Sequence, residues 1–134
     1  MRVVVDTSVW SLAFRRSGAS DHRAVEIVAD LIRDGRVEML GAIRQELLSG
    51  HRSQQTFDRL RERLRAFPDL AMETEDHELA SEFFNRCRRN GIQGSNTDFL
   101  LCAAASRRDL AILTTDRDFE RFAEHLPIRL VDLD

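Results

Sequence analysis

Residues 2–8 read RVVVDTS, a β-branched apolar run that ends in a carboxylate and two small hydroxylated residues. Val3, Val4 and Val5 show no polar alternation, which is typical of a central parallel strand covered on both faces. Asp6 follows at the carboxyl end of that strand, the edge where open α/β sheets bind their ligands. Asp6 equally fits the N-cap of a following helix. The opening segment by itself leaves both interpretations open.

The composition is that of an ordinary globular chain. It has 134 residues, 43% hydrophobic and 32% charged, and this length fits one domain spanning residues 1–134. No apolar stretch approaches the roughly 20 residues of a membrane-spanning helix, and no signal pattern precedes the first strand. Cys87 and Cys102 stand singly in helical patterns, so we expect reduced packing residues. These features predict a cytoplasmic protein with no membrane partner.

Every basic residue in the chain is an arginine or histidine, because there is no lysine. A Walker A loop and a Schiff-base enzyme both need a lysine, so these two classes are excluded. The formal net charge of −3 argues against a broadly basic surface that wraps nucleic acid. Nucleic acid is not excluded as a ligand, since a bound divalent metal inverts the field around a cluster of carboxylates.

Helical and strand patterns alternate along the rest of the chain. An amphipathic helix is expected to open at Ser20 and Asp21 and to end at Gly35, with Ile32 on its inward face. Further helices are expected over 43–48, 57–67, 75–90, 97–105 and around 119–122, and further strands over 37–40, 110–113 and 128–131. This order predicts an α/β protein, a three-layer α/β/α sandwich with a mostly parallel central sheet.

Four acidic residues are expected to meet at one edge of this sheet. Asp6 and Asp116 end the segments VVVD and AILTTD, and neighbouring parallel strands would place them side by side. Asp98 begins the apolar, buried helix over 97–105, and Glu46 lies on the short helix after the second strand. Crowded carboxylates have raised pKa values, and a hard divalent cation relieves their repulsion. Oxygen ligands with no matching His or Cys favour Mg²⁺ or Mn²⁺ over Zn²⁺.

Each acid also has a purely structural interpretation. Asp98 fits a residue that complements the helix dipole, Glu46 a solvated helix position and Asp116 a turn. Asp118 fits a capping box with Thr115, and that role is sufficient for it, although support of a metal site stays open.

Hydroxyl and guanidinium groups near these acids supply further candidates. Thr7, Ser8 and Thr114 are placed to orient carboxylates by hydrogen bonds, and they equally fit ordinary turn and strand-end positions. Weaker candidates for phosphate contacts are Arg15, Arg16, Arg86, Arg88 and Arg89. An arginine near a helix end more often pairs with the helix dipole or stays solvated.

The segments VVVDTSVW, IRQELLSG, GSNTDFLLCAAA and LAILTTDRDF resemble those of the PIN-domain ribonucleases, most closely the VapC-type toxins of VapBC toxin–antitoxin modules. The resemblance spans essentially the whole chain. It implies an acidic catalytic site of Asp6, Glu46, Asp98 and Asp116, with the first, third and fourth as metal ligands. Glu38 is a nearby competitor for the role of Glu46.

The resemblance further implies an Mg²⁺- or Mn²⁺-dependent endoribonuclease that hydrolyses RNA with metal-activated water. The implied partners are an RNA substrate, a small VapB-like antitoxin and a second copy in a homodimer. A phosphatase of the haloacid dehalogenase type would need a second Asp two residues after Asp6, where Ser8 stands. A non-catalytic PIN-like scaffold that binds RNA or protein is the alternative.

Overall fold

The opening valine run forms the centre of a parallel sheet. The computed structural model describes residues 1–15 and 22–134. The strands are β1 (Val3–Val5), β2 (Val37–Glu38), β3 (Ala111–Leu113) and β4 (Arg129–Leu130). Their order is β2-β1-β3-β4, every neighbouring pair is parallel, and Val5 lies opposite Leu113. The predicted parallel sheet is confirmed, and β1 and β3 end side by side.

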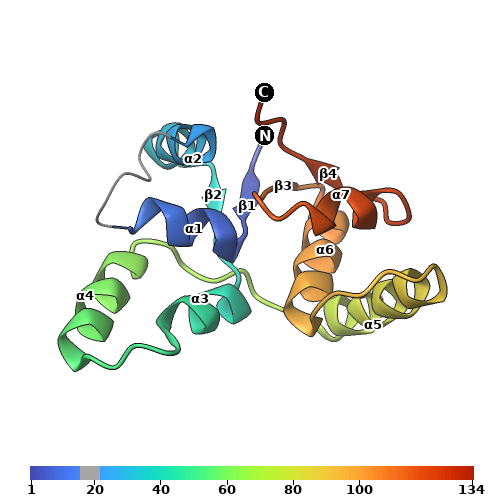
Figure 1. Cartoon of the computed structure of the whole chain (residues 1–134), viewed down its shortest axis with the longest axis horizontal. Coiled ribbons are helices and arrows are strands. Elements are labelled where there is room, and N and C mark those ends of the chain that lie inside the picture. The colour runs from blue at the N-terminus through green and yellow to red at the C-terminus, as the bar shows by residue number, and fades with distance from the viewer. Residues whose placement is uncertain (16–21) are drawn as a thin grey trace.

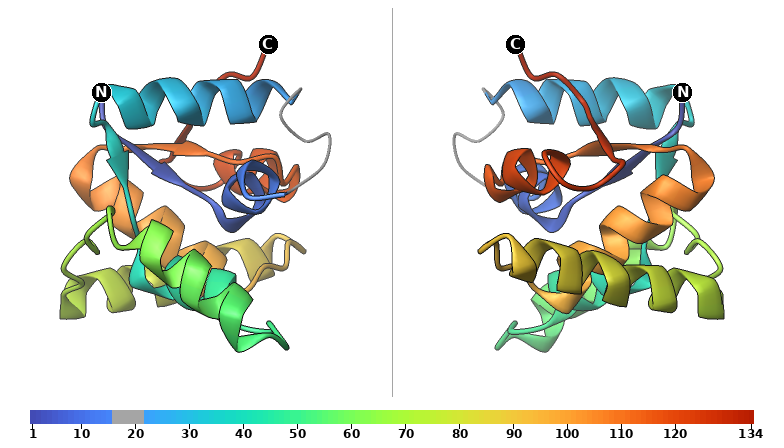
Figure 2. Two further views of the ribbon diagram at one scale, coloured as in Figure 1. Left: turned by 90° about the vertical axis from the view of Figure 1, so that its left-hand side faces the viewer. Right: turned by 90° about the vertical axis from the view of Figure 1, so that its right-hand side faces the viewer.

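Helices cover both faces of this sheet. The described helices are α1 (Thr7–Ala13), α2 (Arg23–Arg33), α3 (Gly41–Leu48), α4 (Gln54–Leu64), α5 (Thr74–Arg89), α6 (Asn96–Arg108) and α7 (Asp118–Ala123). In Figure 2, α2 lies on one side of the sheet and α5 and α6 on the other, which gives the predicted three layers. None of the described helices is long and apolar enough to cross a membrane.

Helix α6 is buried along most of its length, as its apolar composition predicts. Buried side chains from this helix are Phe99, Leu101, Cys102, Ala103, Ala104 and Ala105. The loop before α6 packs tightly against two rings at Gly94, where an added Cβ would lie 2.7 Å from Phe122 Cζ and 3.0 Å from Phe99 Cε2. Glycine therefore allows the loop to deliver Ser95 to the first turn of α6.

Several sequence predictions need correction at the level of single elements. The predicted start of the first amphipathic helix, at Ser20 and Asp21, lies outside the described residues. Helix α2 is capped by His22, whose Nδ1 accepts a hydrogen bond from the Ala24 amide at 3.0 Å. Ile32, predicted to face inward, is 41% exposed. It lies off the stripe that buries Ala24, Val28 and Leu31.

Helix α1 and the lengths of two strands also differ from the prediction. Helix α1, which only the N-cap interpretation of Asp6 anticipated, starts directly after Asp6 and buries Val9 and Trp10. Strands β2 and β4 are each two residues long and therefore shorter than predicted. Cys87 and Cys102 are free and buried, which agrees with their expected packing role.

Candidate functional site

An open cleft at the carboxyl edge of the sheet collects all four predicted acids. In Figure 1, α3 and the first turn of α6 lie on either side of the end of β1. The cleft between them has a volume of about 650 Å³. It is lined by Asp6, Thr7, Ser8, Ala42, Gln45, Glu46, Ser49, Thr97, Asp98 and Asp116. Glu38 forms an ion pair with Arg2 and does not line the cleft, so the structure favours Glu46 over this competitor.

Asp6 occupies the N-cap position of α1, yet its side chain does not cap the helix. Its Oδ2 instead accepts hydrogen bonds from Ser8 Oγ and Thr114 Oγ1, both at 2.8 Å. Only 7% of Asp6 is exposed. Burial raises the pKa of Asp6, and the hydrogen bonds from Thr114 and Ser8 act against that rise. The backbone thus follows the capping interpretation, while the carboxylate faces the cleft.

The two hydroxyls that hold Asp6 are themselves held by the backbone of the β3 end. Ser8 Oγ accepts a hydrogen bond from the Thr115 amide at 3.1 Å, and Thr114 Oγ1 accepts one from the Asp116 amide at 3.0 Å. A hydroxyl has one proton to donate, and here it is directed at Asp6. This network connects the ends of β1 and β3 and fixes the orientation of the Asp6 carboxylate.

Asp98 combines a capping role with a place in the cleft. Its Oδ2 accepts a hydrogen bond from the Ser95 amide at 3.0 Å, and Ser95 Oγ accepts one from the Asp98 amide at 3.1 Å, which forms a capping box. Burial raises the pKa of Asp98, and the negative charges of Asp6 and Asp116 raise it further against the Ser95 hydrogen bonds. The three carboxylates therefore repel one another across the cleft.

The other two acids are held in a similar way. Thr7 Oγ1 donates a hydrogen bond to Glu46 Oε1 at 2.7 Å, and Asp116 Oδ1 accepts one from the Asp118 amide at 2.9 Å. In each of the four carboxylates, one oxygen is thus engaged. The other oxygen accepts no side-chain hydrogen bond from the described part of the chain. All four of these residues line one cleft.

Comparison with known protein families identifies the family of this chain. The PIN domain model matches residues 3–125. The chain belongs to the PIN domain family. Among proteins with curated functions, none matches it in sequence.

Solved structures with the same fold include FitAcB and two VapBC complexes. FitAcB from Neisseria gonorrhoeae is 18% identical, with a TM-score of 0.77 over 98% of this chain and 97% of that one. VapBC2 from Rickettsia felis, bound to a DNA fragment of its promoter, is 14% identical, with a TM-score of 0.79 and full coverage of both chains. DNA-bound VapBC from Salmonella typhimurium is 18% identical, with a TM-score of 0.74 over 100% and 99%. At these identities the likeness establishes the fold.

The donor set of this PIN domain fits a hard divalent cation. The polar groups that line the cleft are carboxylates, hydroxyls and one amide, and no described arginine or histidine lines it. Among residues 1–15 and 22–134, no group of three or more His, Cys, Asp and Glu side chains is placed to hold a metal ion. Mg²⁺ keeps several waters and often takes only one or two carboxylates, so an open set of oxygens suits it. Asp6, Asp98 and Asp116 are among the carboxylates that line this cleft.

The predicted capping box of Thr115 and Asp118 is wrong. The Asp118 amide is capped by Asp116 Oδ1, and the residue before α7, Arg117, makes no side-chain cap. An aspartate often bonds the amide two residues on, and this short turn takes the place of the longer box. Asp118 is exposed and does not line the cleft.

The predicted arginines lie away from the cleft of this PIN domain. Arg86 donates to the His125 carbonyl at 3.4 Å and lies over the Phe83 ring. The Arg88 guanidinium lies over the Phe84 ring, 6.0 Å from its centroid. Arg15 and Arg89 are exposed at the ends of their segments. Arg16 lies outside the described residues. None of the four described arginines lines the acidic cleft.

Sequence reasoning missed four residues that line the cleft, namely Ala42, Gln45, Ser49 and Thr97. Gln45 and Thr97 each directly precede a predicted acid, and this adjacency could have identified them as residues of the cleft. Ala42 and Ser49 come from the two ends of α3, whose position relative to β1 no local pattern specifies.

The hydroxyl network leads to a testable prediction about positioning. Ser8→Ala and Thr114→Val should each weaken Mg²⁺ binding about tenfold, because the Asp6 carboxylate loses one of its two orienting donors. The measurement is the rise in melting temperature against Mg²⁺ concentration, since a loosened ligand raises the concentration needed for half of the effect. Thr115→Val is the matched control, because its side chain makes no contact with Asp6 among the hydrogen bonds described. A normal metal dependence in both variants would remove the positioning role.

Proposed function

We propose that residues 1–134 form a single PIN domain and that this domain is an Mg²⁺- or Mn²⁺-dependent endoribonuclease. In this proposal it acts as the toxin of a toxin–antitoxin pair. The observation that carries the nuclease assignment is the cleft, where four held carboxylates meet and no described arginine neutralises them. Such a site repels a phosphodiester unless a cation binds first. The fold shared with the VapBC and FitAcB structures supports the toxin assignment.

The residues of the site have distinct roles in this proposal. A bound divalent cation would lower the pKa of an attacking water and offset negative charge on the phosphate. Asp6, Asp98 and Asp116 would hold the cation, and Glu46, oriented by Thr7, would complete the site from α3. We expect no covalent intermediate on the enzyme, because the metal-activated water is the nucleophile in this proposal.

Metal dependence tests this function directly. The purified chain should cleave structured RNA with Mg²⁺ or Mn²⁺, and EDTA should lower the rate about a hundredfold or more, reversibly. Fragment ends mapped across total RNA would report the rate and the cleaved sites together. RNA binding that ignores EDTA and is never followed by cleavage would contradict the nuclease and support the scaffold alternative.

The proposed partners are a small VapB-like antitoxin and a second copy of the chain. A groove of about 280 Å³ beside α4 offers an apolar and basic surface, and within it the Arg63 guanidinium lies 4.4 Å from the Phe14 ring centroid. Trp10 is 1% exposed and packs in the core, so it does not contribute to this surface. Co-purification with a small protein encoded next door, with loss of cleavage in the complex, would support the pairing. An active monomer with no such neighbour would count against it.

A further inference from the structure

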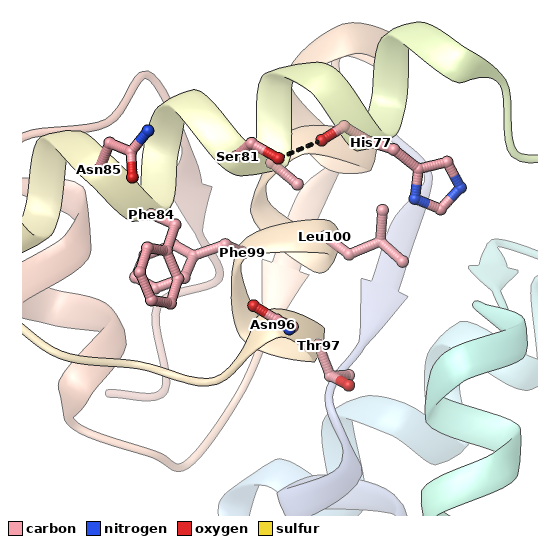
Figure 3. Close-up of a pocket in the computed structure, with 9 residues that line it drawn as sticks. His77, Ser81, Phe84, Asn85, Asn96, Thr97, Phe99 and Leu100 are labelled. Atoms are coloured by element: carbon pink, nitrogen blue, oxygen red, sulfur yellow. Dashed lines mark hydrogen bonds between the residues drawn. The ribbon is translucent and has the colours of Figure 1, made fainter.

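A second cavity lies directly beside the acidic cleft, between α5 and α6. Its volume is about 410 Å³. It is lined by His77, Ala80, Ser81, Phe84, Asn85, Asn96, Thr97, Phe99 and Leu100. Figure 3 shows Asn85 and Asn96 on opposite helices near the two phenylalanine rings, with His77 and Leu100 at the other end.

The cavity and the cleft share one residue. Thr97 lines both of them and directly precedes the proposed metal ligand Asp98. A molecule whose charged part occupies the cleft can therefore place an adjoining group in the cavity. The two spaces fit neighbouring parts of one ligand.

The chemistry of the two spaces differs sharply. The cleft is bordered by four carboxylates, whereas the described lining of the cavity contains no acidic residue, lysine or arginine. The cavity offers instead the half-buried Phe84 ring and the exposed amides of Asn85 and Asn96. An aromatic face and amides that both donate and accept match a flat, neutral ring with a hydrogen-bonding edge. Unpaired nucleobases in RNA are recognised by such stacking and edge contacts.

We propose that this cavity binds an unpaired nucleobase of the nucleotide that adjoins the scissile phosphate, so that it sets the base preference of cleavage. The inference rests on the proposed nuclease function. Phe84 stacks on the base, and Asn85 and Asn96 read its edge. Ser81 contributes less to base reading, because its hydroxyl donates to the His77 carbonyl at 3.0 Å.

The experiment uses the full chain and a pool of RNA with randomised positions around the cleaved bond. Cleaved ends are sequenced in Mg²⁺, and bound RNA is sequenced separately in EDTA. Asn85→Ala and Asn96→Ala should each lower the base preference at one flanking position about tenfold. Phe84→Leu should lower cleavage of all sequences about tenfold, because base stacking is lost whatever the base. Asn90→Ala is the matched control, since this amide lies at the C-terminal end of α5, outside the cavity, and donates to the Arg86 carbonyl.

The outcomes separate the two proposals. If the original chain cleaves RNA and both asparagine variants keep its base preference, the base site is overturned and the nuclease function stands. A base preference in binding without cleavage would support the base site and overturn the nuclease. If neither binding nor cleavage occurs, both fail. If light scattering shows that the substitutions convert a dimer into a monomer while the base preference is kept, the cavity is an interface between copies. The proposal is then overturned.

Discussion

Asp6→Asn and Asp98→Asn are expected to fold normally and to lose RNA cleavage by about 10²- to 10³-fold each. Asparagine at position 6 keeps an oxygen that accepts hydrogen bonds from Ser8 and Thr114, so the local structure is retained. It lacks the negative charge that a hard cation needs. Rates measured with saturating RNA and Mg²⁺ would test this, with Asp118→Asn as the control because that acid is exposed and outside the cleft.

Thermal stability gives a readout that does not depend on activity. Folding raises the pKa of both Asp6 and Asp98, so the folded state binds more protons than the unfolded state above the ordinary value of 3.8. Stability therefore falls as the pH rises through the raised pKa values, and at neutral pH the two ionised carboxylates destabilise the fold. Each Asn variant should melt at the same temperature as the original chain or higher.

With added Mg²⁺, the original chain should melt at a higher temperature than either Asn variant. Mg²⁺ at a hundredfold excess over its Kd would stabilise the original chain by about 2.7 kcal/mol, and it should have little effect on either Asn variant. An Asn variant that melts lower without metal, or that responds to Mg²⁺ like the original chain, would contradict the ligand assignment. Loss of cleavage with an unchanged metal response would instead place the residue at a later step of catalysis.

The positions of the site acids could be predicted because they depend on strong local signals. Apolar runs identify β1 and β3, and parallel pairing then brings Asp6 and Asp116 to one edge. Asp98 follows from the start of a long apolar helix. These signals act through backbone topology, which hydrophobic patterning largely determines.

Thr7, Ser8 and Thr114 could be predicted as groups that orient carboxylates, but the acid that each of them binds could not. Ser8 and Thr114 are 106 residues apart in the chain, and only the register of β1 against β3 makes them meet at Asp6. Local rules also compete with one another, as at Asp118, where the Asp116 side chain rather than Thr115 caps the helix. Helix α1 was anticipated only by the N-cap interpretation of Asp6, because seven residues are too few for a helical period to stand out.

Substitution of Asp76, which forms the capping box of α5 with Glu73, is expected to destabilise the fold more than substitution of the acids in the cleft. The Asp76 side chain is fully buried, although carboxylates are rarely buried without partners. Arg108 binds both of its oxygens at 2.7 and 2.8 Å, and Arg107 approaches Oδ1 to 2.8 Å. The Glu73 amide donates to Oδ2 at 2.8 Å. These contacts join the start of α5 to the end of α6, the two helices that enclose the second cavity.

Asp76→Asn should destabilise the fold by about 2 to 4 kcal/mol at pH 7, because it leaves two arginines facing a neutral group. The figure is below that of a fully buried pair, since the arginine side chains are 29% and 21% exposed. Urea unfolding measures the loss. Asp58→Asn is the control, because its ion pair with Arg61 is exposed on the surface of α4 and should contribute less than about 0.5 kcal/mol.

The same loss should depend on pH in a defined direction. The hydrogen bonds from Arg108, followed by those from Arg107, hold the pKa of Asp76 well below its ordinary value of 3.8, against the effect of burial. The unfolded chain therefore takes up this proton first as the pH falls, and the original chain loses the Asp76 contribution progressively below about pH 5. The stability difference between the original chain and Asp76→Asn should shrink between pH 5 and pH 3. A difference that stays constant over this range would show that Asp76 contributes by packing and not by charge.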